Sequence, residues 1–95
     1  MISIKIHTRN GERLLAACDS ELLGRTFAEK GMRLKVSEIF YGGEEITEEA
    51  LRSRMKGATI LNLVGDRTVT IAEEEGYVSS VIVIDGVKHA QAAVM

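Results

Sequence analysis

The 95-residue sequence contains no proline, no tryptophan and one cysteine. Because it also lacks Gly/Ser-rich and low-complexity stretches, no segment is typical of an interdomain linker. A chain of this length is expected to form one domain, residues 1–95, with one modest core. The single cysteine, Cys18, can form neither an internal disulfide nor a cysteine zinc site, so we expect a reducing, cytoplasmic setting.

Long apolar runs and an excess of positive charge are also missing. The longest apolar run, residues 14–18, has five residues, whereas a membrane helix needs about 20. No basic segment precedes an apolar one, so we expect neither a secretory signal nor a membrane partner. The net charge of −2 argues against binding to nucleic acid by bulk charge. The hydrophobic fraction of 45% argues against a disordered chain.

Catalytic and cofactor motifs are absent from the sequence. It contains no P-loop, GxGxxG, HExxH, GxSxG or CxxC pattern. Two histidines, His7 and His89, are too few for a three-histidine zinc site. The one thiol–imidazole combination would use Cys18, but its apolar surroundings favour a small buried side chain over a nucleophile. We therefore expect no catalytic residue, no metal and no cofactor.

Alternation of apolar and polar residues predicts a strand over residues 2–9. Asn10-Gly11 is typical of a two-residue hairpin turn, and residues 12–18 return as the second strand. A short helix capped by Asp19 or Ser20 is expected next, followed by irregular structure to Gly31. Residues 33–39 alternate again and predict a third strand, which Gly42-Gly43 ends.

The second half of the chain predicts two helices and further strands. Thr47 is a suitable N-cap for a helix over residues 47–56, and residues 58–64 suit a short buried strand. Asp66 can cap a helix running to residue 75, whereas the alternation over residues 68–71 favours a strand there. Residues 81–84 form a β-branched run typical of a strand buried on both faces. Asp85-Gly86 is typical of a hairpin turn that connects this strand to a last strand over residues 87–94.

These elements predict an α+β fold. We expect a two-layer domain with a mixed, mostly antiparallel sheet, two β-hairpins, and two to three helices packed on one face.

Several polar residues and a glycine turn are candidates for ligand binding. His89 and Gln91 share a strand face, where an imidazole and an amide can bind one planar polar ligand such as a base edge. The Asn62 carboxamide, inside an apolar strand, either fixes a neighbouring loop or points into a pocket. The helix start at Asp66 has free N–H groups that can hold an anion. Tyr41, beside two glycines, can stack on a base or cover a small core. The candidates are Tyr41, Gly42, Gly43, Asn62, Asp66, His89 and Gln91.

Basic residues are concentrated in the first third of the chain. Residues 1–35 carry a net charge of +3, and residues 36–95 carry −5. Such a basic segment is either a solvated surface or a contact surface for RNA phosphates. The candidate RNA-binding residues are Lys5, Arg9, Arg13, Arg33 and Lys35.

Four segments in the same order resemble the small archaeal proteins of the family named domain of unknown function 424. They are residues 18–27 (CDSELLGRTF), 40–43 (FYGG), 58–65 (ATILNLVG) and 89–91 (HAQ). The resemblance implies an archaeal, cytosolic α+β protein and supplies no reaction.

Three functions remain open from the sequence. The first is a non-catalytic binding module acting near RNA, a ribonucleoprotein or the translation machinery. The second is an enzyme or small-ligand binder with Asn62, Asp66, His89 and Gln91 around one pocket. The third is a protein-interaction subunit whose last residues, 90–94, add to the edge of a partner's sheet.

Overall fold

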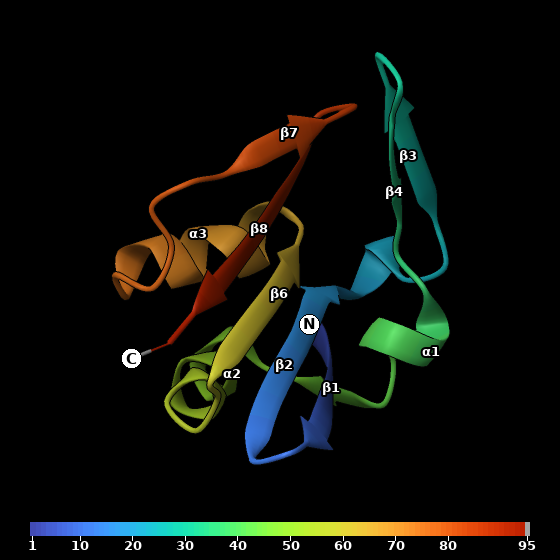
Figure 1. Ribbon diagram of the computed structural model, residues 1–95. Helices are drawn as coiled ribbons and strands as arrows, with labels where there is room; N and C mark the ends of the chain where they lie inside the picture. The colour runs from blue at the N-terminus through green and yellow to red at the C-terminus, as the bar shows by residue number, and fades with distance from the viewer. Residues whose placement is uncertain (95) are drawn as a thin grey trace.

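The first hairpin of the chain forms as predicted in a computed structural model of the protein, which describes residues 1–94 (Figure 1). Strand β1 (Ile2–Arg9) pairs antiparallel with β2 (Glu12–Asp19). Asn10 and Gly11 have φ values of 51° and 81°, the left-handed conformation that a type I′ turn requires at both central residues.

This hairpin belongs to a six-stranded sheet. The strand order is β5-β1-β2-β6-β8-β7, in which β5 is Glu44–Ile46, β6 is Ile60–Val64, β7 is Ile82–Ile84 and β8 is Val87–Ala93. Strands β2 and β6 are parallel, and the other neighbouring strands of this sheet are antiparallel. The prediction of an α+β fold with a mixed, mostly antiparallel sheet is therefore confirmed.

Two helices, α2 (Glu48–Met55) and α3 (Asp66–Glu74), cover one face of the sheet. Their apolar side chains, among them Leu51 and Val69, are fully buried against Ile4 and Leu61 of the strands. The Thr47 hydroxyl accepts a hydrogen bond from the Ala50 N–H at 3.1 Å, which confirms the predicted N-cap. No helix within residues 1–94 has the length and apolar composition needed to cross a membrane.

The opposite face of the sheet carries a second core. Here the short helix α1 (Glu38–Tyr41) and a separate hairpin of β3 (Thr26–Glu29) and β4 (Met32–Lys35) pack on the sheet. Their buried side chains surround Cys18 and Val64 of the sheet. The helices thus lie on both faces, whereas the sequence led us to expect them on one.

The β3–β4 hairpin replaces the irregular segment that we expected up to Gly31. Its turn is Lys30-Gly31, with Lys30 at φ 50°. Lysine is not a residue that favours this conformation, so the sequence carried no clear hairpin signal. The strand predicted over residues 33–39 is also wrong in its second half. Strand β4 ends at Lys35, and the Ser37 hydroxyl caps α1 by accepting from the N–H groups of Ile39 and Phe40.

The strand predicted over residues 81–84 forms, but it is not buried on both faces. Strand β7 is at the edge of the sheet, and Ile82 and Val83 are 47% and 50% exposed. A β-branched run is compatible with either position, because only the strand order decides which strand has two neighbours. Residues 90–93, which we expected to add to the edge of a partner's sheet, belong to β8. This strand pairs with β6 along one side, so only its other side is open to a partner strand.

Candidate functional site

Helix α1 is attached to β1 by three polar side chains of one strand face. The Ser3 hydroxyl donates to the carbonyl of Tyr41 at 3.0 Å, and the Lys5 ammonium donates to that of Ile39 at 2.9 Å. The His7 ring Nε2 lies 2.9 Å from the Phe40 carbonyl and donates to it, and the two rings stack at 4.7 Å. These contacts satisfy carbonyls that a helix end leaves free. The Lys5 ammonium thus contributes to the attachment of α1.

At the turn after α1, two glycines lie close to carbonyl groups of neighbouring backbone. A Cβ on Gly42 would lie 2.5 Å from the Glu38 carbonyl oxygen, and one on Gly43 would lie 3.1 Å from that of Ile4. Position 42 therefore needs glycine for packing against neighbouring backbone, and a side chain at position 43 would be tightly packed. They lie at the β1–β5 edge of the sheet.

Asn62 and Tyr41 form a hydrogen-bonded pair. The Tyr41 hydroxyl donates to Asn62 Oδ1 at 2.6 Å, so the strand carboxamide fixes α1 on the sheet. Burial, followed by the neighbouring Cys18, raises the pKa of Tyr41 to about 12, which keeps the hydroxyl a donor. Of the two roles that the sequence left open for Asn62, the structure shows the attachment of a neighbouring segment.

Asp66 does not cap α3. The N-cap residue is Gly65, and the capping carboxylate comes from Asp19 at the end of β2. Its oxygens accept from the N–H groups of Arg67 at 3.2 Å and Thr68 at 2.9 Å, and from the Thr68 hydroxyl at 2.7 Å. The prediction of an Asp66 cap is wrong because Asp19, 48 positions before Arg67, accepts from the N–H groups that Asp66 was expected to cap.

The four residues of the predicted pocket therefore do not converge. Asn62, His89 and Gln91 are on the same sheet face, with Asn62 directly opposite Gln91 in the register. Asp66, in contrast, lies at the start of α3 beside Glu48 and Arg67. His89 and Gln91 line a shallow hollow of about 270 Å³ with Ser80, Ile82 and Ala90.

Cys18 is fully buried, and its burial, followed by the charges of Asp19 and Glu21, raises the pKa of its thiol to about 12. A thiol in this state is a poor nucleophile. No cluster of three His, Cys, Asp or Glu side chains within residues 1–94 is arranged to hold a metal ion.

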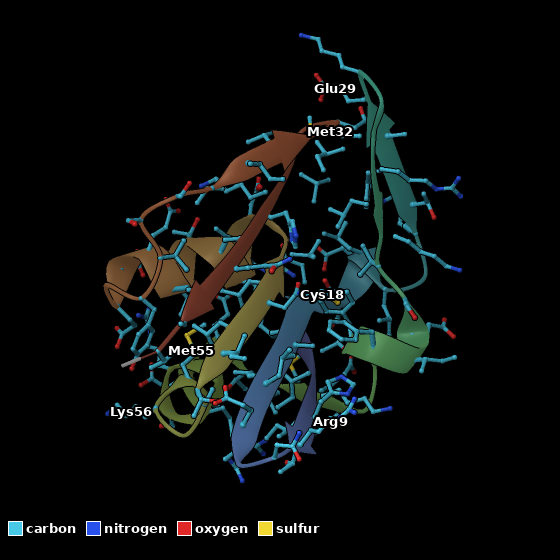
Figure 2. All side chains as sticks on the ribbon, viewed as in Figure 1. Arg9, Cys18, Glu29, Met32, Met55 and Lys56 are labelled. Atoms are coloured by element: carbon cyan, nitrogen blue, oxygen red, sulfur yellow. The ribbon has the colours of Figure 1, made fainter. Side chains whose placement is uncertain are left out.

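The predicted basic residues lie on three different surfaces. Arg9 is exposed at the tip of the first hairpin, far from the β3–β4 tip marked by Glu29 and Met32 (Figure 2). Arg13 points to the opposite sheet face from Arg9, and its Nε donates to the Gly57 carbonyl at 3.0 Å.

Arg33 and Lys35 share the outer face of the β3–β4 hairpin, which we call the arm (residues 24–36). Their register partners Ala28 and Thr26 are also exposed, while Phe27 faces the core. Two residues apart on a strand, Arg33 and Lys35 are separated by about 7 Å.

The arm carries two further cations that are not among the RNA-binding residues predicted from the sequence. Lys30 is exposed at the turn, and the Arg25 guanidinium lies 5.0 Å from the centre of the Phe27 ring. With these residues the arm has four cations and one carboxylate, Glu29. The Glu29 carboxylate accepts from the Asp85 N–H at 2.6 Å. The hairpin brings Arg25 and Lys30 onto the same element as Arg33.

Ion pairs in the described chain are found away from the arm. Within residues 1–94 they involve Arg52, Arg54, Arg67 and Lys88, each with glutamate partners. Glutamates thus neutralise these four cations, whereas the cations of the arm are exposed and take part in none of these pairs.

The comparisons with known proteins agree with this fold. A family model described as "Protein of unknown function (DUF424)" matches residues 7–95. The chain is similar to a solved structure titled "Crystal structure of an uncharacterized conserved protein from Methanopyrus kandleri", with a TM-score of 0.79 and 24% sequence identity. That match covers 99% of this chain and 91% of the other. No curated protein matches the chain.

Proposed function

Since the chain belongs to the DUF424 family of proteins of unknown function, its activity has to be argued from its own surface, and we propose that it is a non-catalytic RNA-binding module. In this proposal the arm binds phosphates of RNA or of a ribonucleoprotein in the cytoplasm of an archaeal cell. One observation carries the proposal: Arg33 and Lys35 share one exposed face of the arm, and no cation of the arm takes part in the ion pairs found within residues 1–94.

The uneven distribution of charge supports this function better than the net charge of the whole protein does. The arm has a net charge of +3 on a protein of net charge −2, so the remaining residues carry −5. A local basic surface attracts phosphates, while the acidic remainder lowers non-specific affinity for nucleic acid. We therefore expect binding in the micromolar range or weaker when the protein is alone.

The geometry of the arm suits a nucleic-acid backbone. Arg33 and Lys35 alternate with the buried Leu34, so both extend to the same side of a two-stranded ribbon. Phe27 and Leu34 hold the inner side of the ribbon on the sheet. The cations are thus carried on a packed element, which limits the entropy lost when they bind phosphates.

The test is RNA binding as a function of salt. Arg33→Ala combined with Lys35→Ala should weaken binding to a single-stranded oligonucleotide and reduce the salt slope by about 1.4, since each phosphate contact contributes about 0.7 for single strands. Fluorescence anisotropy with a labelled oligonucleotide measures both the affinity and the slope.

A matched control removes the same charge elsewhere. Arg9→Ala combined with Lys56→Ala also deletes two exposed cations, and both residues lie far from the arm (Figure 2). This variant should retain most of the affinity and the slope. Absence of RNA binding at low salt, or equal losses in the two double variants, would contradict the proposed function.

A further inference from the structure

The hollow beside β8 forms where two strands of the sheet separate. Strand β7 pairs with β8 from Ile84–Val87 to Ile82–His89 and no further, while β8 continues to Ala93 along β6. Figure 1 shows the two strands diverging from their shared turn. The opening holds about 270 Å³ and is lined by Ser80, Ile82, His89, Ala90 and Gln91.

His89 presents a hydrogen-bond acceptor there. Its Nδ1 lies 2.9 Å from the Leu63 carbonyl oxygen, which can only accept, so Nδ1 carries the proton. In the neutral ring the other nitrogen, Nε2, is then an acceptor. The contact with Leu63 also fixes the orientation of the ring, because β6 belongs to the packed centre of the sheet.

Gln91 adds donors and a second acceptor. Its side chain is exposed and shares the strand face of His89. Backbone groups of successive strand residues point to alternate sides. The Lys88 carbonyl and the Val94 N–H both bond toward β6, to Gly65 and Thr59. The backbone N–H and carbonyl of Gln91 therefore point to the other side, where β7 has already separated from β8.

The apolar side of the hollow is Ile82, which is 47% exposed and directly opposite His89. A planar ligand can rest on this side chain while its edge meets the polar groups of β8. Charged side chains are absent from the hollow lining, so this place does not suit a phosphate. Nucleobases combine an apolar face with a polar edge.

We infer that the hollow binds one nucleobase of the RNA that the arm holds, with His89 Nε2 and the Gln91 carboxamide contacting the base edge. This inference rests on the proposed function. An acceptor on His89 and an amide N–H on Gln91 match a base edge that carries a donor beside an acceptor. Adenine and cytosine offer an amino group beside a ring nitrogen, and uracil and guanine offer a ring N–H beside a carbonyl, so the hollow suits a nucleobase as a class.

The position of the hollow relative to the arm supports one continuous ligand. Glu29 of the arm bonds the Asp85 N–H at the turn between β7 and β8. Strand β8 begins two residues after Asp85, and from Val87 to Gln91 it extends about 13 Å. A short single strand can therefore cover both the arm and the hollow.

The experiment compares a 12-residue cytidine oligonucleotide with a 12-residue abasic ribose-phosphate oligonucleotide by fluorescence anisotropy at low salt. The wild type should prefer the base-bearing oligonucleotide by about fivefold or more. Gln91→Ala and His89→Ala should each reduce that preference to within about twofold and leave the salt slope unchanged. Thr8→Ala, an exposed polar truncation on the first hairpin, is the control and should change neither quantity.

Each result has a distinct meaning. Binding that depends on the arm but shows no preference for the base-bearing oligonucleotide, or a preference that both β8 variants retain, overturns the inference and leaves the proposed function standing. Absence of RNA binding overturns both. Gln91→Ala keeps the test valid if His89→Ala unfolds, since the Gln91 side chain is exposed.

A free nucleotide is the other source of the same base. CMP and AMP are therefore titrated separately, with the Gln91 side-chain amide followed by NMR. Millimolar or weaker binding agrees with a base delivered by RNA. Mononucleotide binding as tight as that of the oligonucleotide, and unaffected by Arg33→Ala with Lys35→Ala, overturns the inference.

Discussion

Asp19 and Gly65 meet at the turn from β6 into α3. Asp19 is 4% exposed and serves as the N-cap carboxylate of α3 across the sheet. Gly65 has φ 109°, and its N–H donates to the Lys88 carbonyl. A Cβ at this position would overlap the Asp19 carboxyl group. The strand-to-helix turn therefore requires glycine for both conformation and space.

Gly65→Ala should destabilise the protein by more than about 2 kcal/mol, because it combines an unfavourable backbone conformation with displacement of the Asp19 cap. The measurement is the free energy of unfolding from a urea titration. Gly76→Ala is the control: Gly76 also has a positive φ, 82°, but nothing lies within 4 Å of its added Cβ. It should cost about 1 kcal/mol. Equal costs for the two variants would mean that the Asp19 contact does not matter.

Buried polar side chains in this protein attach elements to one another. Asn62 holds Tyr41, and Ser3 holds the last carbonyl of α1. In the sequence these residues were indistinguishable from ligand-binding ones, because a carboxamide or hydroxyl on an apolar strand has the same appearance in both roles. The partner decides the role, and Tyr41 is 21 positions away from Asn62.

At the scale of the element, a local cap predicted α2 correctly but not α1. Thr47 caps α2 through Ala50, three residues later, and the glutamates Glu48 and Glu49 follow in the first turn. Ser37 caps α1 just as locally, but the alternation over residues 33–36 favoured a strand there. Helix α3 forms in the predicted place with a cap supplied by another strand, which no local pattern reports.

Thr47→Ala should lower the free energy of unfolding by about 1 kcal/mol, because the Ala50 N–H loses its side-chain acceptor. The urea midpoint measures the change. Ser53→Ala, an exposed position within α2, should change stability by less than about 0.5 kcal/mol. A midpoint unaffected by Thr47→Ala would show that the hydroxyl bond contributes nothing in solution.

At the scale of the whole molecule, two cores lie on opposite faces of one sheet. The second core contains Cys18 and Tyr41, whose pKa values are both raised to about 12. In each case burial is the largest cause. Folding therefore favours the protonated form of both groups, and this contribution to stability is present below the pKa values of the unfolded chain.

Stability should decline in alkaline solution. In the unfolded chain the thiol loses its proton near 9.0 and the phenol near 10.0, whereas the folded groups keep theirs until about pH 12. The free energy of unfolding should thus be flat with respect to these groups up to about pH 8 and fall from about pH 9 toward 12. Cys18→Ala should remove the earlier part of the decline. Urea titrations at several pH values measure it, and an identical decline in the variant would disprove the contribution of Cys18.

The arrangement of charge also belongs to the whole molecule. Arg9 and Arg13 are close in sequence yet point to opposite sheet faces, because strand side chains alternate. Arg25 and Lys35 are ten positions apart and lie on one hairpin, with the Val36 N–H bonded to the Arg25 carbonyl. The basic first third of the sequence is therefore divided among several surfaces, and only its part in residues 24–36 forms the arm.

The sequence by itself determined the α+β class, the first and last hairpins, α2 with its cap, and the strand over residues 60–64. These elements depend on alternation, turn residues and caps that act within a few positions of one another. Tertiary structure alone decided the β3–β4 hairpin, the Asp19 cap of α3, the edge position of β7 and the partner of Asn62. Each of these depends on which distant segments become neighbours, and the energy of such contacts is not encoded in any local pattern.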